Sequence, residues 1–136
     1  MTARGPFFAR RVFLVAGIYG IVVLAPQYFV ELGLPALMER PEHYYGFIGV
    51  ALAWQLAFLI IASNVVRYRP LMLAAVVEKV SFGGAVAVLY SAGRVSIGVL
   101  IAGTLDLILG ALFVAAFMAT RHDSLASVPC TAPNSR

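Results

Sequence analysis

The sequence predicts an all-α integral membrane protein, namely a four-helix bundle with antiparallel neighbours and both termini in the cytoplasm. The first observation is composition, because 62% of the 136 residues are hydrophobic and only 12% are charged, against roughly 25% charged in a soluble domain. A small soluble domain cannot hide that much apolar surface, since it leaves a large share of its chain exposed. The other two observations are four long apolar runs and the placement of most charges at the ends of those runs.

Each apolar run is long enough to cross a bilayer as a helix. A transmembrane helix needs about 20 apolar residues, and it satisfies its own backbone polar groups inside lipid. The first two runs hold no charge, the third holds Glu78 and Lys79, and the fourth holds Asp106. The predicted spans are residues 12–30, 44–66, 71–90 and 95–120.

We expect these spans to form one domain, residues 1–122, followed by a disordered cytoplasmic tail at residues 123–136. The tail contains Pro, Ser and Asn and has no apolar periodicity, which is typical of disorder. Two connections are short, at residues 67–70 and 91–94, and short connections make neighbouring helices antiparallel. Pro70 suits the first turn of the third span.

The arginines predict the orientation of the chain in a bacterial inner membrane. Four crossings place seven arginines on one side and only Arg40 and Arg94 on the other, and the arginine-rich side is cytoplasmic. The seven are Arg4, Arg10, Arg11, Arg67, Arg69, Arg121 and Arg136. We interpret Arg10, Arg11, Arg67 and Arg69 as topology determinants or as contacts to anionic lipid headgroups. Since the charges lie at the ends of apolar runs and not along one face, no nucleic-acid partner is predicted.

Polar side chains lie near the middle of every span. They are Tyr19 in the first, Gln55 in the second, Glu78 and Lys79 in the third, and Asp106 in the fourth. A rise of 1.5 Å per residue places all of them roughly 16 to 20 Å below the outer surface. We therefore expect one polar layer inside the bundle, formed by these five candidate ligand-binding or proton-binding residues.

The charges of this layer should turn inward and pair, because a lone charge at the bilayer centre costs at least about 2.5 to 3.5 kcal/mol. Glu78 and Lys79 are adjacent, so their side chains point about 100° apart around the helix. We expect Lys79 to pair with Asp106, which leaves Glu78 as a spare carboxylate facing Tyr19 or Gln55.

Small residues beside the polar layer indicate close helix packing there. Three groups stand at helical spacing around the polar positions, one in the first span, one in the third and one in the fourth. They are Gly17 and Gly20, then Ala75, Gly83 and Gly84, and then Gly103 and Gly110.

Three functions are compatible with such a layer. The favoured one is non-enzymatic: the layer holds the bundle together, with Gln55 as hydrogen-bonding glue, or it binds a small apolar ligand or a partner subunit. The second is a proton-coupled carrier that works as a dimer, with Glu78 as the protonatable group and Lys79–Asp106 as the gate. The third is an intramembrane enzyme acting on a lipid-like substrate, with Glu78 and Asp106 as acid and base.

Several kinds of site have no signal in the sequence, so no catalytic residue, metal or cofactor is predicted. No glycine-rich phosphate loop is present, and the two histidines lie at or beyond the ends of the spans, where they cannot form a metal cluster or a catalytic triad in the layer. The single cysteine, Cys130, lies in the polar tail. The predicted partners are the lipid bilayer and a second copy or a partner membrane subunit.

Two sequence motifs resemble small bacterial membrane proteins with four spans. The first is Arg67-Tyr-Arg-Pro-Leu-Met followed by Glu78-Lys-Val-Ser-Phe-Gly, and the second is Tyr45-Gly-Phe-Ile-Gly-Val-Ala-Leu-Ala-Trp-Gln. The plan of residues 10–120 is similar to that of the DoxX-like group, which has four spans and a few buried polar residues. The resemblance implies an association with membrane redox systems, and it assigns no active-site residue.

Overall fold

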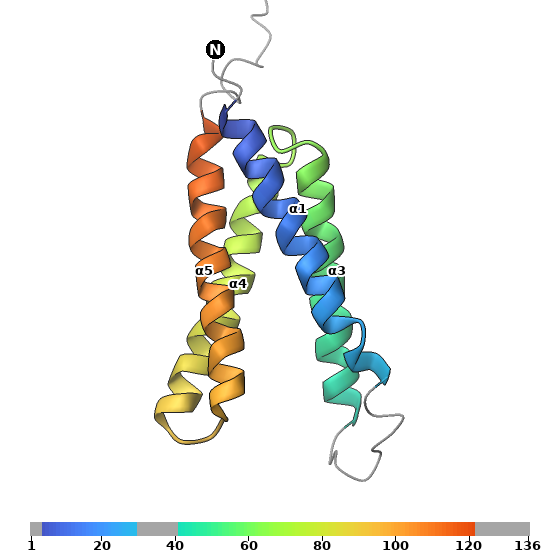
Figure 1. The fold of residues 1–136 in the computed structure, drawn as a ribbon, viewed down its shortest axis with the longest axis vertical. Coiled ribbons are helices and arrows are strands. Elements are labelled where there is room, and N and C mark those ends of the chain that lie inside the picture. Colours follow the sequence, from blue (N-terminus) through green and yellow to red (C-terminus); the bar gives the residue numbers. More distant parts are fainter. Residues whose placement is uncertain (1–3, 30–40, 122–136) are drawn as a thin grey trace, which may run out of the picture.

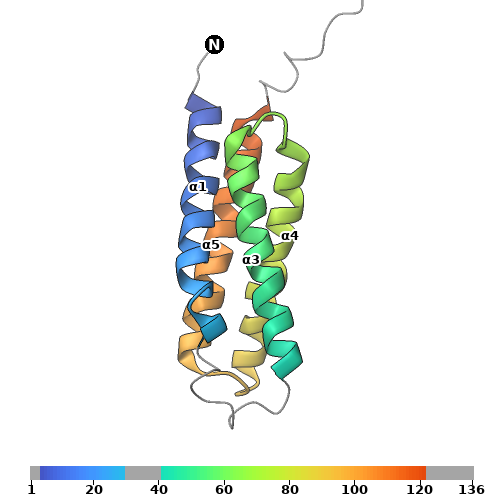
Figure 2. The same cartoon turned by 90° about the vertical axis from the view of Figure 1, so that its right-hand side faces the viewer.

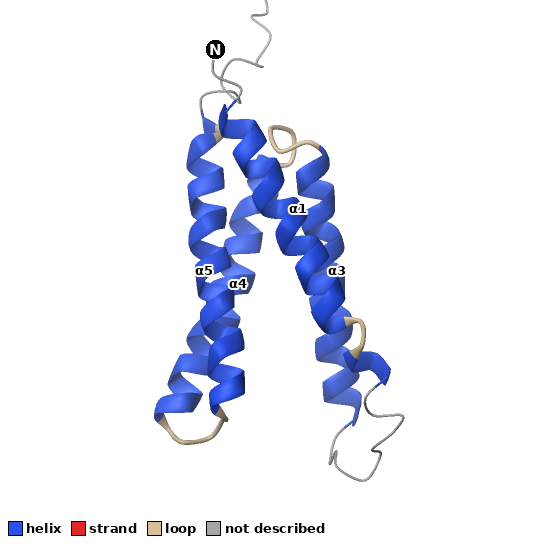
Figure 3. Cartoon of the chain, viewed as in Figure 1, coloured by secondary structure: helices blue, strands red, loops and turns tan. Residues whose placement is uncertain are grey.

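A computed structural model describes residues 4–29 and 41–121, and within these ranges the chain contains helices and no strand (Figure 3). The helices are α1 (Arg4–Leu24), α3 (Pro41–Ser63), α4 (Arg69–Ser91) and α5 (Ile97–Ala119), shown in Figure 1. Each of the four is long and apolar enough to cross a membrane. The predicted fold class is therefore confirmed, as an all-α bundle with four candidate spans. The predicted tail at residues 123–136 lies outside the described residues.

Helix α1 differs from the first predicted span at both ends. It begins at Arg4 and includes the exposed Arg10 and Arg11, so the helix extends beyond the charge-free run. Long cationic side chains at a helix end reach the polar interface while their stems cover apolar surface. The helix ends at Leu24, because Pro26 follows and disfavours helical geometry in the residue before it.

The two short connections have the local structures that their sequences predict. Helix α4 carries Pro70 in its first turn, where the missing N–H breaks no helical hydrogen bond. At the other end of α4, Gly93 has a positive φ of 68°, and its N–H donates to the Tyr90 carbonyl at 2.9 Å. The Arg94 N–H donates to the Leu89 carbonyl at 2.9 Å. This glycine-terminated turn reverses the chain into α5.

The helices pack as two antiparallel pairs, α1 with α3 and α4 with α5. Helix α1 also contacts α5, whereas α3 and α4 contact each other far less. The pairs meet where α1 begins and diverge towards the opposite end (Figure 1), while the view turned by 90° shows the helices side by side (Figure 2). We call the end that holds Arg4 and Arg121 the closed end, and the end that holds Pro41 and Ser91 the open end.

The apolar core lies in the half of the bundle next to the closed end. Three aromatic rings form its centre, and we call them the phenylalanine cluster: Phe13 of α1, Phe58 of α3 and Phe113 of α5. The ring centroids of Phe13 and Phe113 are 4.2 Å apart and those of Phe58 and Phe113 are 5.0 Å apart. Small and aliphatic residues surround these fully buried rings, namely Ala9, Ala16, Ile61, Ala62, Val65, Met72, Ala75 and Ala116.

The distribution of side chains is the reverse of that in a soluble bundle. Large apolar side chains on all four helices face outward, whereas Gln55 is 2% exposed and Lys79 is 4% exposed. Water would penalise this arrangement, since exposed apolar area is unfavourable there, but lipid favours it. The bundle is therefore compatible with a multi-pass membrane protein.

Two neighbouring glycines of α4 provide a matched test of this packing. A Cβ on Gly83 would lie 2.8 Å from the Gly103 carbonyl oxygen of α5, whereas a Cβ on Gly84 would meet nothing within 4 Å. We expect Gly83→Ala to lower the free energy of unfolding by about 1 to 3 kcal/mol, because α4 and α5 must separate. Gly84→Ala should leave stability unchanged. Unfolding in detergent micelles measures both variants, and equal losses would contradict the observed α4–α5 contact.

Candidate functional site

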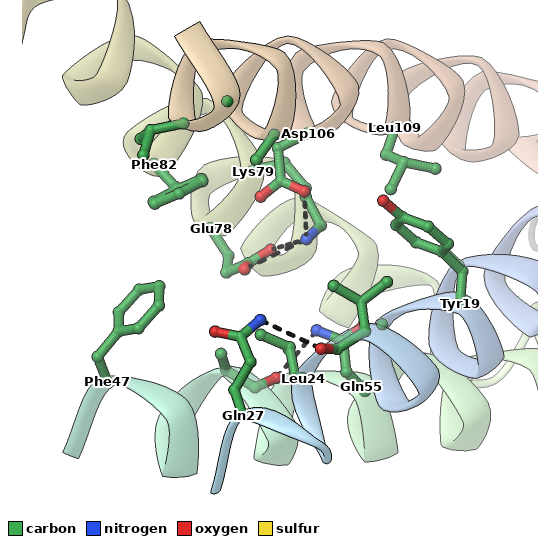
Figure 4. Close-up of a pocket in the computed structure, with 17 residues that line it drawn as sticks. Tyr19, Leu24, Gln27, Phe47, Gln55, Glu78, Lys79, Phe82, Asp106 and Leu109 are labelled. Carbon is green, nitrogen blue, oxygen red and sulfur yellow. Dashed lines mark hydrogen bonds and ion pairs between the residues drawn. The ribbon is translucent and has the colours of Figure 1, made fainter. Parts of the chain in front are cut away.

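One buried ammonium holds two carboxylates in the middle of the bundle (Figure 4). Lys79 Nζ of α4 lies 3.0 Å from Asp106 Oδ1 of α5 and 3.3 Å from Glu78 Oε2. The expected Lys79–Asp106 pair is thus present. Glu78, expected to face Tyr19 or Gln55 as a spare carboxylate, shares the same ammonium. The flexible lysine stem and its three N–H donors allow it to contact its sequence neighbour as well as α5.

The two contacts of Lys79 are unequal. Its hydrogen bond to Asp106 Oδ1 is 3.0 Å long, whereas its hydrogen bond to Glu78 Oε1 is 3.4 Å, beyond the usual range for such bonds. Glu78 Oε2 is a buried atom that accepts no hydrogen bond from the described residues. Asp106 is therefore the main partner of Lys79, and Glu78 is only partly satisfied.

The surroundings of Lys79 explain how α4 brings an ammonium to this depth. Gly110 of α5 lies against the lysine stem, since a Cβ there would be 3.3 Å from Lys79 Cβ. The ring of Phe58 stands on the other side, with its centroid 5.3 Å from Nζ, a distance at which an aromatic ring attracts a cation. Phe58 therefore links the phenylalanine cluster to the ion pair.

A cavity of about 300 Å³ opens beside these charges, and all four helices line it. The five polar candidates from the sequence all face it: Tyr19, Gln55, Glu78, Lys79 and Asp106. Its deepest part reaches residues that belong to or pack on the core, Ala16 and Leu109. The remaining lining is mainly apolar and continues towards the open end. The structure therefore brings the predicted layer together around a space and not around a filled core.

The amide of Gln55 makes a different bond from the interhelical one expected. Its Nε2 donates to the Ala51 carbonyl of its own helix at 2.9 Å. Its Oε1 lies against Gly20 of α1, so closely that a Cβ at that position would overlap the amide. Gln55 thus joins α1 and α3 through close packing on a glycine. Tyr19 lines the same cavity with 42% of its surface exposed.

A second hollow lies between α3 and α4, the neighbouring helices that contact each other least. We call it the α3–α4 groove. It shares Phe47, Ala51, Glu78 and Phe82 with the central cavity. The rings of Phe47 and Phe82 face each other across it, with centroids 5.8 Å apart. Glu78 thus lines both hollows, together with the two rings.

Sequence reasoning missed Phe47 and Phe82 as residues of the site. Phe82 follows Glu78 by four residues, so both side chains lie on one face of α4, and that spacing was the available signal. Phe47 had no comparable signal, because its place opposite Phe82 depends on how α3 and α4 pack.

The four arginines proposed for topology or lipid contact have different surroundings. Arg69 donates from Nε and Nη2 to the Phe117 carbonyl at 3.2 and 3.1 Å. Its guanidinium also lies 3.7 Å from the centroid of the Phe117 ring. It therefore caps the last turn of α5, where a cation is favoured, a role that sequence reasoning did not identify. Arg10, Arg11 and Arg67 are exposed at the closed end.

No family model, curated protein or solved structure matches this chain. Within residues 4–29 and 41–121, no three His, Cys, Asp or Glu side chains are grouped closely enough to hold a metal ion. The function is therefore inferred from the geometry of the site.

Replacing the shared ammonium tests how the charges depend on each other. We expect Lys79→Met to lower the free energy of unfolding by about 3 to 5 kcal/mol, because it leaves two carboxylates without a counter-ion in a buried site. Adding Asp106→Leu should recover only part of this loss, since Glu78 still lacks its cation. Adding Glu78→Leu as well should recover most of it. Unfolding in micelles measures the series, and full recovery in the double variant would show that Glu78 does not depend on Lys79.

Proposed function

We propose that this chain is a ligand-binding protein of the bacterial inner membrane, and that its cavity binds a small, mainly apolar molecule with one polar group. The observation that carries the proposal is the cavity of about 300 Å³ with its polar layer on one side and apolar walls elsewhere. Small-molecule sites are typically concave and mostly apolar, with a few polar groups that orient the ligand.

A purely structural role for the layer explains less of the site. A layer that served only stability would be closely packed, because protein interiors fill their space and voids weaken them. Here the helix pairs diverge beside the charges, and Glu78 Oε2 is left without a hydrogen-bond donor. Such a buried acceptor costs free energy until a donor reaches it. A ligand in the cavity supplies that donor.

The proposed orientation places the cavity mouth outside the cell. The exposed Arg10, Arg11 and Arg67 lie at the closed end, and positively charged loops favour the cytoplasmic side. We therefore place the closed end and both termini in the cytoplasm, and the open end towards the outside. The ligand then reaches the site from the outer half of the membrane or from the external water. The DoxX-like resemblance stays a prediction, and the proposal does not depend on it.

Filling the cavity should remove ligand binding. Ala102 of α5 lines the cavity, whereas Ala115 of the same helix is exposed and does not line it. We expect Ala102→Trp to abolish saturable binding of radiolabelled 1-adamantanol, a compact neutral probe, because the indole occupies the space. Equilibrium dialysis of the protein in micelles measures the binding.

The matched control is Ala115→Trp, which should bind 1-adamantanol like the unaltered protein. Melting curves of both variants establish that they fold. Equal binding by the two tryptophan variants would overturn the proposal, because the probe would then be held outside the cavity.

A proton-coupled carrier is the second candidate, and one observation favours it. The cavity ends at Ala16 and Leu109, which belong to or pack on the core near the closed end, while its lining continues to the open end, which is one of the two states that alternating access requires. Rocking of the α1–α3 pair against the α4–α5 pair would produce the other state, and a chain of four spans would carry this out as a dimer. The enzyme hypothesis has no such support in the described residues, since one ammonium holds both carboxylates and neither is set apart as the acid.

A binding protein and a carrier differ in the side of the membrane from which a thiol reagent reaches a cysteine in the cavity. The probe is Ala102→Cys in a Cys130→Ser background, treated with a membrane-impermeant thiol reagent on one side of oriented proteoliposomes at a time. A binding protein should react only from the open-end side, because the phenylalanine cluster blocks the other. Reaction from both sides would establish the carrier instead. The otherwise unaltered protein, labelled at its native Cys130, reports which side carries the C-terminal tail.

A further inference from the structure

The charges that line the cavity do not balance. Among the described residues that line it, Glu78 and Asp106 are acidic and Lys79 is basic, so the ionised site carries one excess negative charge. A net charge in an apolar, partly buried site is unfavourable, because little water remains to solvate it. One bound monocation restores neutrality, whereas an anion would add to the imbalance.

The hydrogen-bonding groups show the same bias. Lys79 directs its donors at Asp106 and Glu78. Glu78 Oε2 accepts no hydrogen bond, and none of the described residues donates to Asp106 Oδ2 or to Gln55 Oε1. Around Lys79 the site thus presents acceptors that no described residue satisfies, and the Tyr19 hydroxyl, which also lines the cavity, offers only one uncharged donor. An ammonium group brings several N–H donors on one positive charge, and bonds from it to carboxylates are the strong, charge-assisted kind.

The walls around these acceptors select an apolar body. The rings of Phe47 and Phe82 lie beside Glu78 in the lining of both hollows, and Figure 4 shows both rings next to the carboxylate. Aromatic faces pack on apolar groups and attract cations. The α3–α4 groove opens between the two helices and is also lined by Glu78, so a molecule dissolved in the bilayer reaches this carboxylate without crossing water.

From these features we propose that the ligand is a lipophilic monoamine, with its ammonium bound by Glu78 and Asp106 and its apolar body in the cavity against the rings of Phe47 and Phe82. This inference rests on the proposed function, because it names the class of ligand that the cavity binds. A neutral molecule of the same shape would leave the excess charge in place, and an anionic one would add to it.

The test compares three probes that share one apolar cage and differ only in their polar group. They are 1-adamantylamine, 1-adamantanol and 1-adamantanecarboxylate. Equilibrium dialysis measures the binding of each probe to the full chain in micelles. The Ala102→Trp variant, measured in the same way, gives the amount of probe that the detergent takes up. We expect the amine to bind at least about tenfold more tightly than the alcohol, as a charge-assisted hydrogen bond implies. The carboxylate should show no saturable binding.

A charge-neutralising variant should remove the preference. In Glu78→Gln the amine and the alcohol should bind within about twofold of each other, because the excess charge is gone. Glu42→Gln is the matched control, since Glu42 is an exposed carboxylate of α3 that does not line the cavity, and it should keep the preference. If Glu78→Gln does not fold, Asp106→Asn removes the same charge and gives the same comparison.

The outcomes distinguish this inference from the proposed function. Equal affinities for the amine and the alcohol in the unaltered protein would overturn the monoamine assignment and leave the ligand site intact. Tighter binding of the carboxylate would overturn the charge argument. Failure of all three probes to bind above the Ala102→Trp background would overturn the proposed function itself.

Discussion

The cost of a charge in hydrocarbon is the constraint on which this structure depends. Lys79 is almost fully buried, and an ammonium at that depth is tolerated only beside counter-charges. Asp106 provides the nearest one at 3.0 Å, which ties α4 to α5 at one height, while Glu78 adds a second and more loosely held carboxylate. Since one lysine cannot neutralise both, the pairing that stabilises the bundle also leaves the cavity with one excess negative charge.

The packing around this pair is asymmetric, and the asymmetry makes room for a site. Aromatic rings from three helices fill the half next to the closed end, so the bundle has a firm core there. Towards the open end the helix pairs separate, and α3 and α4 contact each other little. The polar layer lies at the boundary between the two halves, with the phenylalanine cluster on its closed-end side and the cavity on its open-end side. One half therefore supplies stability and the other supplies access.

Composition and charge placement predicted the fold well, because long apolar runs in lipid have few alternatives to helices. The inward-facing layer was also predictable, since each span offers a polar group at one depth and charges in lipid must meet. The cavity, the Phe47–Phe82 contact and the sharing of Lys79 by two carboxylates were not. They depend on the angle between helix pairs and on side-chain rotamers, which residue spacing does not determine. Glycines illustrate the limit: Gly83 contacts α5 as expected, whereas a Cβ on its neighbour Gly84 would meet no atom within 4 Å.

The bond between Arg69 and the Phe117 carbonyl has a mechanical consequence. It fastens the first turn of α4 to the last turn of α5, so any tilt of this pair would have its pivot near the closed end, where the three rings pack. A helix of about 23 residues is roughly 35 Å long, and a tilt of a few degrees about that pivot shifts its far tip by a few ångström while the rings barely move. A small tilt set by contacts at the polar layer would therefore become a larger change in the separation of the helix pairs at the open end.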